Sequence, residues 1–338
     1  MLLKKMAAAA ACLLLSAAVL TGCGTSEAQI LWIGAGGQGG TYYNYATELS
    51  SYINKAHKEL APEARTTAGS AANLRLIGKN FLDMAIVQGD ILESAVEGRG
   101  IYEEPQDLTG ISAAAALYTE AVQIVVRSDA GISSVSDLKG KEVSVGEEES
   151  GVRQNATQIL EANGLTTSDI NIHYMSFADS ADAMRSGSLD AFFVTAGAPT
   201  EAIEELAEDM SITLLSLDQT TMDILEGLYT SYVTVTIPAG TYTGQTEEVM
   251  TLGVKAVLVV SNAISDEVVK DVISTIFDKQ SELHKLTPNE SELTADFASS
   301  NIAIGFHSGA VSYYADKGIS VAETDGELPT IQSGTQDD

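Results

Sequence analysis

FLDMAIVQ at Phe81–Gln88 and SLDAFFVT at Ser188–Thr195 are two octapeptides of the same shape, and they decide the fold. In each, Leu-Asp precedes a continuous apolar run that leads into a turn containing glycine. Short apolar runs bounded by turns are typical of strands that are buried on both faces of a sheet. The repetition predicts two lobes built on one α/β plan.

A second pair of similar segments predicts how the lobes are joined. AVQIVVRS at Ala121–Ser128 and AVLVVS at Ala256–Ser261 both have the composition of strands. One would leave the first lobe and the other would return to it. We therefore expect two crossing strands, with the hinge near Val126–Arg127 and around Leu252–Lys255.

Elsewhere, short apolar strands alternate with amphipathic helices, which is the sequence form of α/β architecture. Helices are predicted to begin at Ser70 and Ser150, each serine acting as an N-cap, and a long helix is predicted over Asp266–Lys285. The expected boundaries are lobe I at 30–126 plus 255–320, lobe II at 127–254 and a flexible tail at 321–338.

The N-terminus has the pattern of an export signal. Lys4 and Lys5 precede an apolar run that is too short to span a membrane, and Leu20–Cys23 (LTGC) follows. This pattern predicts a lipoprotein signal peptide at 1–22, acylation of Cys23 and a short tether at 23–29. A plain secretory peptide with an incidental cysteine is the alternative. The expected location is extracytoplasmic, at the cell surface or in the periplasm, with a lipid anchor in the membrane.

Charge and cysteine usage exclude several function classes. The 338 residues include 18 Lys and Arg against 47 Asp and Glu, a net charge of −29. Such an acidic chain lacks the cations needed to displace counterions from a nucleic-acid backbone. The two cysteines, Cys12 and Cys23, both lie in the first 23 residues. We expect no metal site, because the folded part has no cysteine and its four histidines lack metal-binding spacing.

A glycine-rich turn at Gly34–Gly39 matches the G-x-G-x-x-G pattern of dinucleotide sites. Export argues against a nucleotide there, because ATP and NAD(P)H are scarce outside the cytoplasm. Two tyrosines, Tyr42 and Tyr43, also crowd the start of the next helix. We expect no cofactor, although the same turn and helix N-terminus could hold another anion.

Unusual residues gather at the predicted strand-to-helix turns: Gly39-Gly40-Thr41, Ser70–Asn73, Gln88–Asp90, Ser150–Arg153 and Gly197–Thr200. These turns meet at the carboxyl edge of a parallel sheet, where α/β proteins bind ligands. Each turn alone is also explained by helix capping. Arg153 stands out because a cation in the first turn of a helix opposes the helix dipole. It would pair with a ligand carboxylate or, alternatively, with a surface acid.

Several motifs resemble the TAXI family of TRAP-transporter solute receptors. They are GGTYY (39–43), GSAANLRL (69–76), LDMAIVQGD (82–90), DLKGKEVSVG (137–146), SGVR (150–153), LDAFFVTAGAPT (189–200), IPAGTYTGQ (237–245) and HSGAVSYY (307–314). The resemblance implies a type II periplasmic-binding-protein fold with two α/β lobes joined by two crossing strands. It also implies capture of a small organic carboxylate, such as glutamate or 2-oxoglutarate. Delivery would be to a fused TRAP permease that an ion gradient drives.

The resemblance also implies which residues would touch the ligand. The first-lobe wall would contain Gly39, Gly40, Thr41, Tyr42, Ser70, Asn73, Gln88 and Tyr118, and the second-lobe wall Ser150, Gly151, Arg153, Gly197 and Ala198. Val152 replaces the threonine that many relatives have, so the identity of the ligand stays open. We expect a monomer without catalytic activity; an exported enzyme or a ligand sensor on the same fold are the alternatives.

Overall fold

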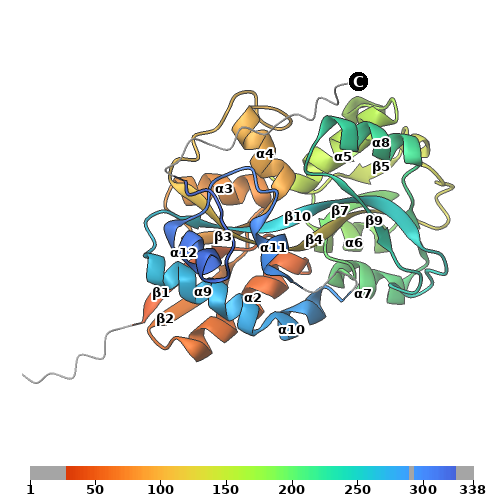
Figure 1. Cartoon of the computed structure of the whole chain (residues 1–338). Helices are drawn as coiled ribbons and strands as arrows, with labels where there is room; N and C mark the ends of the chain where they lie inside the picture. The colour runs from red at the N-terminus through yellow and green to blue at the C-terminus, as the bar shows by residue number, and fades with distance from the viewer. Residues whose placement is uncertain (1–27, 289–292, 325–338) are drawn as a thin grey trace, which may run out of the picture.

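The computed structural model describes residues 28–288 and 293–324. They form two α/β lobes that share one continuous sheet (Figure 1). The predicted signal peptide and Cys23 lie outside the described residues. Among the residues described, no helix is long and apolar enough to cross a membrane.

Lobe I combines an N-terminal and a C-terminal part of the chain. Its elements are β1 (Gln29–Gly34), α2 (Thr41–Ala56), β2 (Leu60–Arg65), α3 (Ser70–Gly78), β3 (Met84–Gln88), α4 (Gly89–Glu97), the first part of β4 (Ile111–Arg127), the last part of β10 (Val249–Ser261), α9 (Asp266–Asp278), α10 (Gln280–Leu283), the 3-10 turn η3 (His284–Leu286), α11 (Ala295–Ser299) and α12 (Ser308–Asp316).

Lobe II is made by the middle of the chain. Its elements are the end of β4, η1 (Val135–Leu138), β5 (Glu142–Ser144), α5 (Gly151–Ala162), η2 (Thr167–Asp169), β6 (Asn171–His173), α6 (Phe177–Arg185), β7 (Ala191–Ala196), α7 (Glu201–Asp209), β8 (Ile212–Leu215), α8 (Gln219–Leu228), β9 (Val233–Ile237) and the start of β10.

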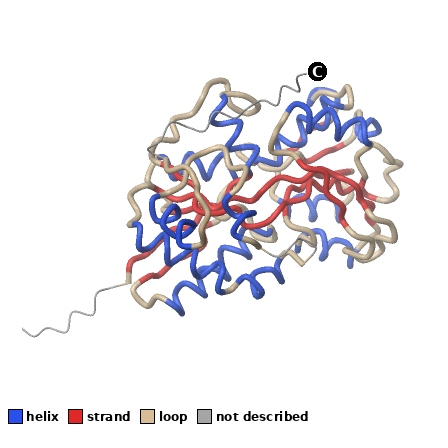
Figure 2. Tube along the Cα trace, in the orientation of Figure 1, coloured by secondary structure: helices blue, strands red, loops and turns tan. Residues whose placement is uncertain are grey.

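The ten-stranded sheet has the order β2-β1-β3-β10-β4-β7-β5-β6, with β8 paired to β4 and β9 to β10. The strands run without a break from one lobe into the other (Figure 2). In lobe I, β1 is parallel to β2 and β3, and in lobe II, β5 is parallel to β6 and β7. The crossing strands β4 and β10 are antiparallel to each other, β4 is antiparallel to β7, and β10 is antiparallel to β3. This arrangement confirms the predicted type II periplasmic-binding-protein fold with two crossing strands.

The two octapeptides occupy equivalent places in the two lobes. One supplies β3 and the other supplies β7, and every residue of both strands is buried. Helices cover both faces of the sheet, so these strands are mostly apolar and do not alternate with polar residues. Burial of this apolar surface, at about 25 cal/mol per Å², is the main force holding each lobe together.

The hydrophobic cores of the lobes are separate. The core of lobe I contains buried residues up to Tyr118 and again from Ala256 on. The two core clusters of lobe II lie between Ala121 and Val254. Between these limits the chain passes from one lobe to the other in β4 and β10.

The strand crossing differs from the expected hinge on one side. β4 pairs with β10 up to Ala121 and with β7 from Ala121 to Val126. On β4 the pairing therefore changes from β10 to β7 at Ala121 and not at Val126–Arg127. The reason is that β7 pairs with β4 from Ala121 onward. On β10 the change falls between Gly253 and Ala256, within the expected range.

Two other expectations need correction. The helix predicted over Asp266–Lys285 is interrupted at Lys279, whose φ of −113° and ψ of 14° break the helical path into α9, α10 and η3. The expected tail starts as ordered chain: Phe306 donates to the Ala322 carbonyl at 2.8 Å, and Thr324 donates to the Phe306 carbonyl at 3.0 Å. The rest of that tail lies outside the described residues.

Candidate functional site

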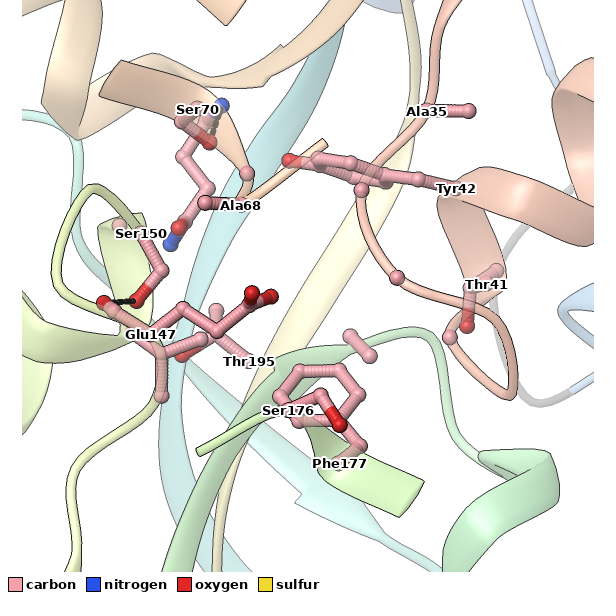
Figure 3. A pocket seen from close by; sticks show the side chains of 18 of the residues that line it. Ala35, Thr41, Tyr42, Ala68, Ser70, Glu147, Ser150, Ser176, Phe177 and Thr195 are labelled. Carbon is pink, nitrogen blue, oxygen red and sulfur yellow. Dashed lines mark hydrogen bonds between the residues drawn. The ribbon is translucent and has the colours of Figure 1, made fainter. Parts of the chain in front are cut away.

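A pocket lies between the two lobes (Figure 3). The space inside it is about 510 Å³, counting the mouth that opens to solvent. Its lining comes from Ala35, Gly36, Gly37, Gly40, Thr41, Tyr42, Ala68, Gly69, Ser70 and Gln88 in lobe I and from Glu147, Ser150, Gly151, Val152, Met175, Ser176, Phe177, Thr195 and Ala196 in lobe II.

Every lining segment ends or follows one of the parallel strands β1, β2, β3, β5, β6 and β7. The pocket therefore occupies the carboxyl edge of the sheet in both lobes at once. Ligands of open α/β sheets bind at this edge, because the loops there are free to vary while the strands hold them in place.

The pocket is also where helices start. The N-caps of α2, α3, α4, α5 and α6 are Gly40, Gly69, Gln88, Ser150 and Ser176, and all of them line it. A helix N-terminus carries about half a positive charge and has free backbone N–H groups. The pocket consequently has a positive bias without a cationic side chain in its described lining.

Two glycines allow the lobes to meet across the pocket. A Cβ atom at Gly151 would lie 1.6 Å from Oε1 of Gln88, so a larger residue would displace that side chain. Gly69 has a φ of +113° and approaches Ser150, whose Cα would be 3.2 Å from a Cβ at that position. Glycine is needed at both places, once for close approach and once for backbone conformation as well.

Asn155 of α5 links both lobes beside the pocket. Its Oδ1 accepts hydrogen bonds from Gln88 of lobe I at 2.7 Å and from Thr195 of lobe II at 2.8 Å. Its Nδ2 donates to Asp90 at 2.8 Å and to the hydroxyl of Tyr232 at 2.7 Å. Because Asn155 is fully buried and satisfied, it specifies the relative position of α4 and α5.

Further contacts join the lobes around this centre. Glu93 of α4 accepts from the hydroxyl of Thr230 at 2.9 Å and from the amide of Ser231 at 3.2 Å. Thr41 donates to the carbonyl of Gly197 at 3.2 Å. The structure is therefore that of closed lobes.

Tyr42 forms one wall of the pocket (Figure 3). Its hydroxyl donates to Oε1 of Glu120 at 2.5 Å. Burial and the adjacent Glu120 carboxylate raise the pKa of Tyr42 well above its ordinary value, so the phenol is a neutral donor. Tyr42 thereby ties the start of α2 to the strand that crosses between the lobes.

Glu147 provides the one charged side chain among the described lining residues. Its carboxylate points into the pocket from lobe II (Figure 3), and Oε2 would lie 3.8 Å from a Cβ at Gly37 in lobe I. Partial burial, and secondly the nearby Asp179, raise the pKa of Glu147. Within the described chain no hydrogen bond or ion pair to this carboxylate is observed.

Several residues expected at the site do line the pocket: Gly40, Thr41, Tyr42, Ser70, Gln88, Ser150 and Gly151. Ser150 caps α5 as predicted, accepting from the amide of Arg153 at 3.2 Å. Ser70 is not an N-cap, because that position belongs to Gly69. Its Oγ instead accepts from the amide of Gln88 at 3.0 Å and joins α3 to the end of β3.

The other expected residues do not line this pocket. Gly39 lines a neighbouring groove, and Asn73 donates to the carbonyl of Ile86 at 2.8 Å inside lobe I. Tyr118 packs on Tyr45, with ring centroids 5.5 Å apart. Gly197 and Ala198 are not among the lining residues, and a Cβ at Gly197 would be 2.8 Å from the side chain of Thr287.

Arg153 also points away from the pocket. It lines a separate groove with Arg75 and Glu149, and its guanidinium donates to the carbonyl of Glu148 at 3.0 Å. The same group lies 5.4 Å from the ring centre of Tyr174. Gly151 and Val152 are buried, so the helix is oriented with Arg153 toward solvent. The amino acids of this turn do not by themselves indicate that orientation.

Glu147, Phe177 and Thr195 are among the lining residues that the sequence analysis did not predict. Thr195 had a usable signal, because it ends the second octapeptide as Gln88 ends the first, and both line the pocket. Glu147 belongs to an acidic run, Glu147–Glu149, that is typical of a solvated loop. Phe177 follows no pattern that distinguishes it from a core residue.

Among the described residues, His57, Glu59 and Asp271 could together approach a metal ion. None of them lines the pocket. Nδ1 of His57 lies 3.2 Å from Asp271 and 3.7 Å from Glu59.

Fold and site together define a two-lobed protein of the type II periplasmic-binding-protein class with a pocket between its lobes. The chain belongs to the NMT1-like family, whose sequence model matches residues 33–318.

Solved structures of similar fold have little sequence identity to the chain. A protein from Bordetella bronchiseptica RB50 is 16% identical, with 85% of this chain and 88% of that chain covered and a TM-score of 0.52. An ancestral arginine-binding protein bound to arginine is 14% identical, covering 76% and 97%, with a TM-score of 0.48. The alkanesulfonate-binding protein SsuA from Xanthomonas axonopodis pv. citri, bound to MOPS, is 15% identical, covering 78% and 79%, with a TM-score of 0.47.

Proposed function

We propose that the protein is an extracytoplasmic receptor that captures a small organic carboxylate between its lobes. The observation that carries this proposal is the pocket at which helices α2 to α6 begin. α2, α3 and α4 belong to lobe I, whereas α5 and α6 belong to lobe II, so each lobe offers only part of the positive field. A carboxylate is fully surrounded by donors only when the lobes are closed.

Capture then follows from a shift between open and closed states. A ligand favours closure by the difference between its affinities for the two states. The contacts of Asn155 and Glu93 join the two lobes, and they stabilise the closed state with or without a ligand. Neutral hydroxyls and backbone N–H groups bind the anion despite the net charge of −29, because screening at about 0.15 M salt limits long-range repulsion to about 8 Å.

The proposed function is binding without catalysis. The described lining has serines but neither histidine nor cysteine, and it has one carboxylate, Glu147. Nucleophilic catalysis by serine needs an adjacent base, and glycoside hydrolysis needs two carboxyl groups. This composition supports a receptor over an exported enzyme.

The partner in this proposal is a TRAP-type permease driven by an ion gradient, and the attachment is a lipid on Cys23. Both rest on the sequence: the permease on the ordered motifs shared with TAXI receptors, and the lipid on the LTGC pattern. Cys23→Ser should keep the protein from partitioning into detergent phase when it is expressed in a bacterial host, while the unchanged protein partitions there.

Thermal unfolding of the full-length protein in detergent tests the capture of carboxylates. We expect the melting temperature to rise with at least one compound in a panel of acidic amino acids, dicarboxylates and oxo acids, because a ligand that binds only the folded state stabilises it. At 100 times the Kd the gain is about 2.7 kcal/mol. A panel without any shift would reject the carboxylate proposal.

A further inference from the structure

Glu147 is a negative group in a pocket whose helix N-termini favour negative ligands. Its loop leaves β5, and its carboxylate reaches across toward Gly37 in lobe I. A ligand in the closed pocket therefore meets both the N-termini and this carboxylate.

The protein itself provides no partner for Glu147 in the described lining. The polar side chains around the pocket are neutral: those of Thr41, Tyr42, Ser70, Gln88, Ser150, Ser176 and Thr195. Lys141 and Arg153 are the cations nearest to Glu147 in sequence, and they donate to the Ala130 and Glu148 carbonyls instead. The other acid that acts on Glu147, Asp179, is exposed and accepts from Ser176 at 2.7 Å.

A carboxylate loses hydration when a ligand fills the pocket beside it, and a charged partner on the ligand offsets this loss. A guest with only negative charge would leave Glu147 uncompensated and add repulsion at close range. A guest that carries an ammonium group beside its carboxylate would satisfy Glu147 and the helix N-termini together.

We propose that Glu147 is a specificity-determining residue that binds a protonated amine of the ligand, and that the ligand class is amino acids rather than oxo acids or simple dicarboxylates. This inference rests on the proposed function, because it assigns the amine of the same ligand whose carboxylate the proposed function assigns. Glu147 selects the amine, and the N-termini of α2 to α6 hold the carboxylate.

Two ligand series separate the contributions of the charges. 2-Oxoglutarate and pyruvate carry a keto group where L-glutamate and L-alanine carry the ammonium group, and 4-aminobutyrate and ethylamine are the same two amino acids without the α-carboxylate carbon. Within each series, either the ammonium or the α-carboxylate is removed. Calorimetric titration of the full-length protein should give a Kd for at least one amino acid that is lower by at least about 10-fold than the Kd for its oxo acid, as expected when a charge-assisted pair is lost.

Glu147→Gln tests the residue with little change of shape. The variant should weaken amino acid binding by about 10- to 100-fold and leave the affinity for the oxo acid unchanged or higher. Glu148→Gln is the matched control, because it removes the same charge from the next residue, which is exposed and outside the pocket. We expect this control to bind like the unchanged protein.

The outcomes distinguish the inference from the proposal beneath it. Oxo acids that bind as tightly as amino acids, or amino acid binding that Glu147→Gln leaves intact, would overturn the role of Glu147 while carboxylate capture stands. Ethylamine that binds as tightly as L-alanine, with loss in Glu147→Gln, would support the amine contact and reject the carboxylate. No binding in either series would reject both.

Discussion

At the scale of single residues, the loop between β5 and α5 shows that the charge of a side chain does not predict whether it faces the pocket. Glu147 and Arg153 both have charged side chains near the N-terminus of α5, yet the acid faces the pocket and the cation faces a separate groove. The direction depends on which residues of the loop are packed. Ser150, Gly151 and Val152 are buried against lobe I and the core of lobe II, which directs Arg153 outward.

Arg153→Ala should therefore leave ligand binding intact. The variant loses a hydrogen bond to the Glu148 carbonyl and a contact with Tyr174, both at the surface, so we expect the free energy of unfolding to change by about 0.5 kcal/mol or less. The ligand-induced rise in melting temperature should equal that of the unchanged protein. If the variant lost this ligand-induced rise, Arg153 would have to contact the ligand.

Thr195→Val is the contrasting variant at the same scale. It keeps the shape of the side chain but removes the hydroxyl that donates to Asn155 at 2.8 Å and lines the pocket. We expect a loss of about 1–3 kcal/mol in stability, because a buried acceptor loses one of its donors. The ligand-induced shift should also shrink; a full shift would place the ligand away from β7.

At the scale of elements, α4 and α5 form the main contact between the closed lobes. Asp90 in the first turn of α4 accepts from Gln154 at 3.0 Å and from Asn155 at 2.8 Å, both on α5. Burial raises the pKa of Asp90 to about 7, with the hydrogen bonds from Asn155 and Gln154 opposing this rise and Glu93 adding to it. The helix contact is thus sensitive to protonation near neutral pH.

Asp90→Asn should change the pH dependence of stability. A carboxyl whose pKa is raised on folding stabilises the folded state most when both states are protonated, below about pH 4. This contribution falls as the pH rises through about 7. We expect the melting temperature of Asp90→Asn, relative to that of the unchanged protein, to increase from pH 5 to about pH 7 and to level off above that pH.

Comparing the two proteins at each pH cancels the effect of the other acidic groups, which is considerable at a net charge of −29. Asp107→Asn controls for the loss of one negative charge, because Asp107 is exposed and lies outside this helix contact. A difference between Asp90→Asn and the unchanged protein that is constant over this pH range would show that Asp90 titrates normally.

At the scale of the whole molecule, two strands connect two independent cores. β4 and β10 cross side by side, and Gly253 allows the approach, since a Cβ there would lie 2.7 Å from Val235 and 2.9 Å from the Glu120 carbonyl. Arg75 forms a further contact between the lobes, an ion pair with Glu149 at 2.6 Å. Exposed ion pairs contribute little, so the closed state depends on the ligand and the buried contacts.

X-ray scattering should therefore detect two states of the protein. We expect the radius of gyration to be larger without ligand and to fall when the carboxylate with the largest thermal shift is added, because closure brings the lobes together. A compound that gives no thermal shift should leave the radius unchanged. Equal dimensions with and without the ligand would contradict capture by closure.

The sequence by itself determined the architecture. The octapeptides at β3 and β7 and the strand pair at β4 and β10 consist mostly of apolar residues, which predicts that these strands are buried. It also located the turns that approach the pocket, since Gly40, Ser70, Gln88, Ser150 and Gly151 follow strands. Buried strands and the turns that follow them are local consequences of apolar runs and glycines in the sequence.

Only the tertiary structure decided which side chains face the pocket. Arg153 and Asn73 were expected there and lie elsewhere, whereas Glu147 was not expected and supplies its charge. A side chain's direction depends on the rotation of its loop against residues distant in sequence, such as Gln88 against Gly151. Packing across the two lobes sets that rotation, so composition and spacing within one turn do not contain it.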